Sequence, residues 1–80
     1  MKIPRDLSAK VLIKALKKYG YEVLRQSGSH ISLVTQEFGE HHITIPNHNP
    51  LKLGTLSGIL QSIAEHRHTT KQEIMNELFD

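Results

Sequence analysis

The chain has 80 residues, a net charge of +2 with its six histidines counted as neutral, and no cysteine. A chain of this length forms one small domain, which buries about 60 to 65% of its unfolded surface. Without cysteine it has neither disulfides nor a thiolate zinc site, so hydrophobic packing must hold the fold. No stretch approaches the roughly 18 apolar residues of a membrane span, and residues 1–6 contain no apolar run, so we expect a cytoplasmic protein that binds no membrane.

The first predicted element is an amphipathic helix. Ser8 is a suitable N-cap, and Gly20 is a suitable end. Between them, apolar residues recur at helical spacing, namely Val11, Leu12, Ala15, Leu16 and Tyr19. Four lysines fall on the opposite side: Lys10, Lys14, Lys17 and Lys18. This lysine stripe is either a solvated helix face or a ridge that contacts phosphates.

Three strands are predicted next. Residues 21–26 are rich in β-forming side chains, and a tight turn at Gly28 leads into a second strand over residues 30–35. A second turn at residues 37–40 leads into a third strand over residues 41–46. Strict alternation places the inward side chains on one face, namely Ile31, Leu33, Ile43 and Ile45. His30, His42 and Thr44 then line the opposite face or its edge.

Two further helices complete the prediction. We expect Thr55 to cap a helix that packs one stripe onto the sheet, formed by Leu56, Ile59, Leu60 and Ile63. A polar break at residues 65–68 precedes Thr70 and Glu73, whose spacing is that of a capping box. The last helix has an apolar edge of Ile74, Leu78 and Phe79. The predicted fold is a single α+β domain, residues 1–80, with both main helices on one face of a three-stranded antiparallel sheet and a short C-terminal helix.

Metal chemistry does not fit the six histidines. His41 and His42 are adjacent on a strand and therefore point to opposite faces, and His66 and His68 are two residues apart at a helix end. No Asp or Glu is spaced to complete a tetrahedral set of ligands. We therefore expect neither a metal site nor a small-molecule cofactor.

The remaining chemistry uses a nucleophile that the substrate supplies. Ser29 and His30 are sequence neighbours without an acidic partner, which does not favour a Ser-His hydrolase. In RNA the 2′-hydroxyl can attack the adjacent phosphate when one group accepts its proton and cations stabilise the phosphorane. His30 is the candidate acid–base residue, with Arg25 or the lysines as phosphate contacts.

Each of these residues also has a structural interpretation. His30 could simply be a strand-edge histidine that hydrogen-bonds the turn, and Arg25 an exposed cross-strand partner. His48 either fixes its loop or contacts substrate. The other histidines, His41, His42, His66 and His68, are interpreted as solvated surface residues.

Four segments resemble the HicA toxin family, in order and with matching spacing. They are residues 17–21 (KKYGY), 25–30 (RQSGSH), 45–48 (IPNH) and 54–56 (GTL) together with Ile59 and Leu60. The resemblance covers about residues 8–63, with residues 64–80 as a C-terminal extension. It implies a fold similar to double-stranded-RNA-binding domains and a ribosome-independent, metal-independent mRNA endonuclease. The catalytic histidine of the family maps onto His30, and the turn that presents it onto Gly28 and Ser29.

The resemblance also implies partners. These are an mRNA substrate and a HicB-like antitoxin that covers the active site. The family's Pro-x-His element maps onto Pro46 and His48, to which we assign no catalytic role, and Asn49-Pro50 departs from the glycine often found there. Two alternatives stay open: an RNA-binding module that uses the lysine stripe without cleavage, and a protein-binding domain that uses the open sheet face.

Overall fold

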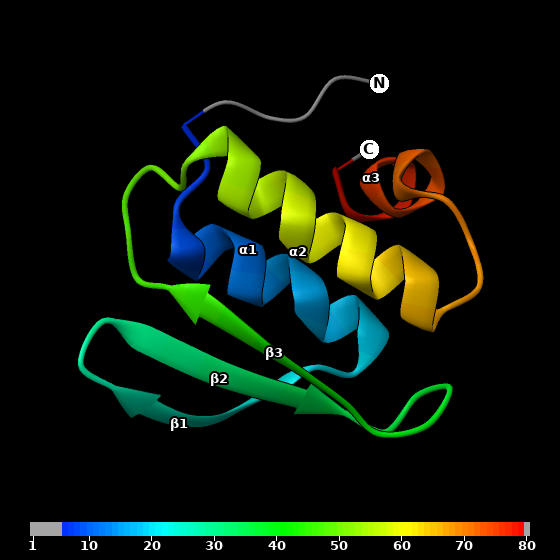
Figure 1. Ribbon diagram of the computed structural model, residues 1–80, viewed down its shortest axis with the longest axis horizontal. Helices are drawn as coiled ribbons and strands as arrows, with labels where there is room; N and C mark the ends of the chain where they lie inside the picture. Colours follow the sequence, from blue (N-terminus) through cyan, green and yellow to red (C-terminus); the bar gives the residue numbers. More distant parts are fainter. Residues whose placement is uncertain (1–5, 80) are drawn as a thin grey trace.

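The protein forms two layers, with the helices covering one face of a three-stranded sheet (Figure 1). The computed structural model describes residues 6–79. Residues 1–5, which include most of the N-terminal segment considered above, and Asp80 lie outside the described part. The element order is α1 (Ala9–Leu16), η1 (Lys17–Tyr19), β1 (Glu22–Ser27), β2 (His30–Thr35), β3 (His41–Pro46), α2 (Leu53–His66) and α3 (Lys71–Phe79). The α+β class and the arrangement of its elements are therefore as predicted, and they are consistent with the fold of double-stranded-RNA-binding domains.

The first helix begins and ends as its sequence predicts. The Ser8 hydroxyl accepts a hydrogen bond from the Val11 amide at 3.2 Å, which satisfies one of the free donors of the first turn. After Leu16 the chain tightens into the 3₁₀ turn η1, and Gly20 ends it in the left-handed conformation at φ 77°. The backbone angle at Gly20 favours glycine, and a Cβ there would lie 2.8 Å from a carboxylate oxygen of Glu37, so any other residue would also have to displace that side chain.

The sheet is an antiparallel meander in the order β1-β2-β3. The predicted inward side chains are all buried: Ile31, Leu33, Ile43 and Ile45. The first strand begins one residue later than predicted, and all six of its residues are exposed. Its register shifts between Val23 and Arg25, which is the sign of a β-bulge at Leu24. Among the described residues the strand therefore forms an unpaired outer edge of the sheet, and it contributes little to the core.

The second helix differs from the prediction at its start. It begins at Leu53, with Lys52 as an extended N-cap that provides no side-chain hydrogen bond, so Thr55 lies inside the first turn and the predicted cap is wrong. The preceding Leu51 is buried, and its amide donates to the Leu7 carbonyl at 2.7 Å. This tertiary contact decides where the chain turns into the helix, and a local capping signal cannot reveal it. The helix then runs through His66, into the segment predicted as a polar break.

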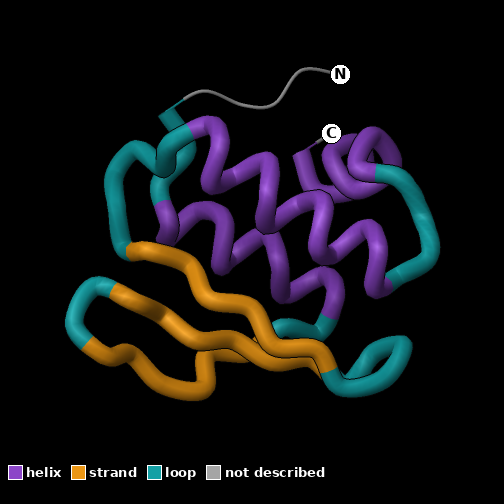
Figure 2. The backbone as a smooth tube through the Cα atoms, viewed as in Figure 1, coloured by secondary structure: helices purple, strands orange, loops and turns teal. Residues whose placement is uncertain are grey.

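The short last helix packs on the domain. Thr70 caps it, since its hydroxyl accepts from the Glu73 amide at 3.1 Å, as the sequence predicts. Ile74, Met75 and Leu78 are buried against the main core, and Figure 2 shows α3 beside α2 on the side away from the sheet. The C-terminal residues up to Phe79 are thus part of the folded domain.

Candidate active site and nucleic-acid interface

His30 stands at the first position of β2, directly after a two-residue turn. Gly28 has a φ of 58°, and no atom would lie within 4 Å of a Cβ placed there, so the turn needs glycine for its backbone angle alone. The side-chain amide of Gln26 donates a hydrogen bond to the Gly28 carbonyl oxygen at 3.1 Å and supports the turn. The His30 side chain is exposed and forms no side-chain hydrogen bond within residues 6–79. The turn therefore presents an imidazole that the fold does not use.

Backbone hydrogen bonds join three segments around this turn. The Asn47 amide donates to the Ser29 carbonyl at 2.6 Å, and the Ala9 amide donates to the His48 carbonyl at 3.2 Å. The β1–β2 turn, the loop after β3 and the start of α1 consequently lie at the same end of the molecule, on the left in Figure 1. The arrangement brings the segments that carry His30, His48 and Lys10 together, although they are far apart in the sequence.

The open face of the sheet carries a second basic group. Cross-strand partners share a face, and Ser27 pairs with His30 while Arg25 pairs with Ser32. Arg25 is thus the diagonal neighbour of His30, at a Cα separation of roughly 7 to 8 Å in such pairs. The β-bulge brings it there, because an unbroken alternation from Val23 would have placed Arg25 on the helix side.

Three of the four lysines predicted as a ridge stay together. Lys10, Lys14 and Lys17 line one shallow hollow along α1. Lys18 turns away from them, and its Nζ donates to the carbonyl oxygens of Glu77 at 3.2 Å and Leu78 at 3.5 Å. Lys18 therefore caps the end of α3, where a cation also interacts favourably with the helix dipole.

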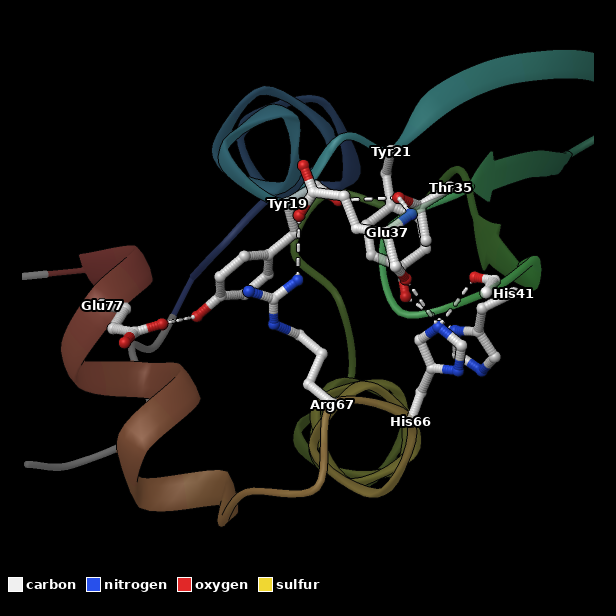
Figure 3. A network of polar contacts seen from close by, with 9 residues as sticks. Tyr19, Tyr21, Thr35, Glu37, His41, His66, Arg67 and Glu77 are labelled. Carbon is white, nitrogen blue, oxygen red and sulfur yellow. Dashed lines mark hydrogen bonds and ion pairs between the residues drawn. The ribbon is translucent and has the colours of Figure 1, made fainter.

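The histidines at the opposite end of the sheet have structural contacts (Figure 3). The His41 imidazole is hydrogen-bonded to the Tyr21 hydroxyl at 2.6 Å through Nδ1 and to the Ser62 hydroxyl at 3.2 Å through Nε2. It also stacks on His66, with 4.3 Å between ring centroids. Burial, followed by the neighbouring His66 and His42, lowers the pKa of His41. The interpretation of His41 as a solvated surface residue is therefore wrong.

His66 is likewise engaged. Its Nε2–H donates to the carbonyl oxygens of Glu37 and Gly39 at 2.9 and 3.0 Å, which closes the β2–β3 turn over the end of α2. Its interpretation as a solvated residue is also wrong. The available sequence signal is the spacing of Ser62 and His66, which share one helix face at i and i+4. His42 and His68 are exposed as expected, and His42 pairs with Glu40 at 2.6 Å.

Arg67 organises the rest of this end. Its guanidinium lies 3.8 Å from the ring centroid of Tyr19 and 4.6 Å from that of Phe38, and it donates to a Glu37 carboxylate oxygen at 3.0 Å. Tyr19 in turn donates its hydroxyl to Glu77 on α3. Burial and then Glu77 raise the pKa of Tyr19, and burial raises the pKa of Tyr21 to about 12. Both tyrosines thus remain protonated near neutral pH and serve as hydrogen-bond donors.

Within residues 6–79, no three His, Asp or Glu side chains lie close enough together to hold a metal ion. No helix in the same part of the chain is long and apolar enough to cross a membrane.

A family model described as the HicA toxin of bacterial toxin–antitoxin systems matches residues 9–64 of the chain. The chain belongs to the HicA toxin family. The match covers α1, the whole sheet and α2 up to Ala64. It gives the chain the role of a toxin and implies an antitoxin as its partner. No curated protein and no solved structure matches the chain.

Proposed function

We propose that this HicA-family toxin is a metal-independent endoribonuclease of mRNA and that His30 is its acid–base residue. The observation that carries the proposal is the contrast in hydrogen bonding, because His30 is exposed on the turn while His41 and His66 are held by other side chains and carbonyl groups. An imidazole is the side chain best suited to proton transfer near neutral pH. Substrate and toxin would meet in the cytoplasm, where mRNA is translated.

The reaction follows from the chemistry of RNA. His30 accepts the proton of a 2′-hydroxyl, and the 2′-oxygen forms a bond to the adjacent phosphorus while the bond from phosphorus to the 5′-oxygen breaks. The leaving oxygen takes up a proton from water, and the products are a 2′,3′-cyclic phosphate and a 5′-hydroxyl end. Arg25 on the open face and Lys10 at the start of α1 are the cations proposed to stabilise the charge on the phosphorane.

The proposed RNA contacts extend from this end along α1. Lys10, Lys14 and Lys17 lie along one helix side and suit a row of phosphates. Around the turn, Gly28 and Ser29 are proposed to contact the substrate, and His48 lies in the neighbouring loop. Lys18 is left out of this set, because its ammonium group is already bonded to α3.

A HicB-like antitoxin is the proposed inhibitor, and it would cover the end of the molecule that carries His30.

A non-catalytic RNA-binding module is the second candidate function, and the three lysines along α1 favour it because they suit phosphate binding without any chemistry. The two candidates differ in what His30 does. A binding module keeps its RNA affinity in His30→Ala and loses it when two of the three lysines are neutralised.

The test uses end-labelled RNA and toxin purified free of antitoxin. We expect cleavage in the presence of EDTA, with 2′,3′-cyclic phosphate at the new ends. A substrate with a single 2′-deoxynucleotide at the cleaved position should stay intact there, because it lacks the nucleophile. Cleavage of this substrate at the same position, or cleavage that needs an added divalent ion, would contradict the mechanism. RNA binding with no cleavage by the wild-type chain would favour the second candidate.

A further inference from the structure

Exposed apolar side chains occur on the two elements next to the lysine row, α1 and β1. Five large hydrophobic side chains are exposed among the described residues, and three of them belong to α1 and β1. They are Val11 (52% exposed), Val23 (52%) and Leu24 (58%). Side chains of this kind gain free energy when a partner covers them, and several together mark an interaction surface more strongly than single scattered ones.

Two shallow hollows connect Val11 and Val23 into one surface, while Leu24 lines neither hollow. The first is lined by Lys10, Val11, Ile13, Lys14 and Lys17, and the second by Lys17, Gly20, Tyr21, Glu22 and Val23. They meet at Lys17. We call the combined surface the α1–β1 groove, and it runs from the first turn of α1 to the start of β1.

The groove is strongly biased in charge. Its lining contains three lysines and one acidic residue, Glu22. Within residues 6–79 none of these lysines forms an ion pair, since the two ion pairs found there are His42 with Glu40 and Arg67 with Glu37. The groove is therefore complementary to an acidic ligand.

The lysines of the groove suit phosphates as well as carboxylates, but the apolar side chains between them fit a peptide better than a nucleic-acid backbone. The methyl groups of Val11 and Val23 have no hydrogen-bond partner to offer a phosphodiester backbone, and the groove has no exposed aromatic ring on which a base could stack. A segment that alternates acidic and apolar side chains satisfies both the lysines and the valines. The strand β1 next to the groove is paired on one side only, by β2, within the described residues.

We propose that the α1–β1 groove is the docking surface for an acidic, amphipathic segment of the antitoxin. The proposal rests on the toxin role in the proposed function and assigns to the antitoxin a surface outside the His30 turn. Because Lys10 belongs both to the groove and to the end of the molecule that carries His30, a bound segment takes up lysines that the RNA would need. Inhibition then follows from competition along α1 as well as from any cover over the turn.

The test measures binding directly, with no RNA present. The purified toxin is titrated with the HicB-like antitoxin expressed alone, at low and at high salt. In the double variant Val11→Glu/Val23→Glu, which places two carboxylates in the groove, we expect the Kd to rise by about 100-fold or more. The matched control is Leu53→Glu, which makes the same kind of change at a side chain that is 47% exposed on α2 and should alter the Kd by less than about 3-fold.

A second measurement uses the wild-type complex, so that it does not depend on how the variants fold. Hydrogen exchange of the toxin should slow in α1 and β1 when the antitoxin binds. An unchanged Kd in the folded double variant, or protection absent from α1 and β1, would overturn the proposal. The proposed endonuclease activity is tested separately by RNA cleavage. A toxin that binds the antitoxin through the groove but cleaves no RNA would refute the endonuclease function and still support the docking surface.

Discussion

At one end of the β2–β3 pair, His30 and His48 form no side-chain hydrogen bond within residues 6–79, whereas at the other end His41 and His66 are stacked and bonded. The register makes the contrast direct, because β2 begins at His30 opposite Pro46 and ends at Thr35 opposite His41. Histidines at one end hold the elements together, whereas those at the other form no such contact within the described residues. The number of histidines in the sequence does not separate these roles, but their hydrogen-bond partners do.

Both ends depend on the same core, and a core variant should give the largest loss of stability. Leu60 on α2 is fully buried between the helices and the sheet. Leu60→Ala should lower the free energy of unfolding by about 2 to 5 kcal/mol, because it removes buried methyl groups and leaves a cavity. Urea denaturation followed by circular dichroism measures the change. A loss below about 1 kcal/mol would contradict the packing of α2 on the sheet.

A substitution at the end of the sheet that carries His41 and His66, called the structural end below, should cause the next largest loss of stability. Arg67→Ala removes the cation from between two aromatic rings and breaks its ion pair with Glu37. We expect a loss of about 1 to 3 kcal/mol, since the Arg67 side chain is mostly buried and packs along its length. The control is His48→Ala at the other end, which should change stability by less than about 0.5 kcal/mol. Equal losses of unfolding free energy in Arg67→Ala and His48→Ala would contradict the claim that the two ends differ in their structural role.

The turn that presents His30 should show a smaller effect. Gly28→Ala places a side chain at a φ of 58°, and we expect a cost of about 1 kcal/mol from backbone strain alone, as there is room for the methyl group. Gly58→Ala is the matched control, because Gly58 lies inside α2 with open space around it and alanine should stabilise a helix by up to about 1 kcal/mol. Thermal unfolding of both variants shows whether each substitution raises or lowers stability. A stabilising Gly28→Ala would contradict the left-handed backbone conformation of this turn.

The smallest expected effect is a pH dependence that belongs to the structural end. The folded chain lowers the pKa of His41, so between that value and about 6.5 the unfolded chain binds a proton that the folded chain does not. Stability from this group is fully present above about pH 6.5 and falls as the pH drops through the window below it. The neighbouring Tyr21, with a pKa of about 12, stays neutral throughout.

His41→Asn is the variant that isolates this effect. Asparagine carries no titrating group, so the slope of unfolding free energy against pH should be shallower than in the wild type over the same window. The lowered pKa of Glu40, caused first by its hydrogen bond to His42, acts only at more acidic pH. Identical slopes in the variant and the wild type would show that His41 does not titrate differently in the folded chain.

Most of the fold could be predicted because it depends on local patterns. The alternation around Ile31 and Ile43 fixes the two inner strands, and the Ser8 and Thr70 caps were recognisable from spacing. The start of α2 was not, because the buried Leu51 and its backbone bond to Leu7 set it. Contacts between distant residues leave no trace in a local pattern.

The residues of the candidate site and its surroundings likewise fall into those that the local sequence reveals and those that it does not. His30 and its turn could be found from the sequence, since Gly28 and Ser29 are adjacent to it. The roles of Lys18 and His41 could not, because the first bonds carbonyl groups about 60 residues away and the second meets side chains from two other segments. Both roles required the tertiary arrangement.

The most direct measurement compares His30→Ala with His41→Ala in two assays, RNA cleavage per amount of folded protein and the free energy of unfolding. We expect His30→Ala to abolish cleavage while the free energy of unfolding stays within about 0.5 kcal/mol of the wild type. We expect His41→Ala to lose stability while its folded fraction still cleaves RNA. Cleavage that persists in His30→Ala and disappears in folded His41→Ala would contradict the assignment of the two ends.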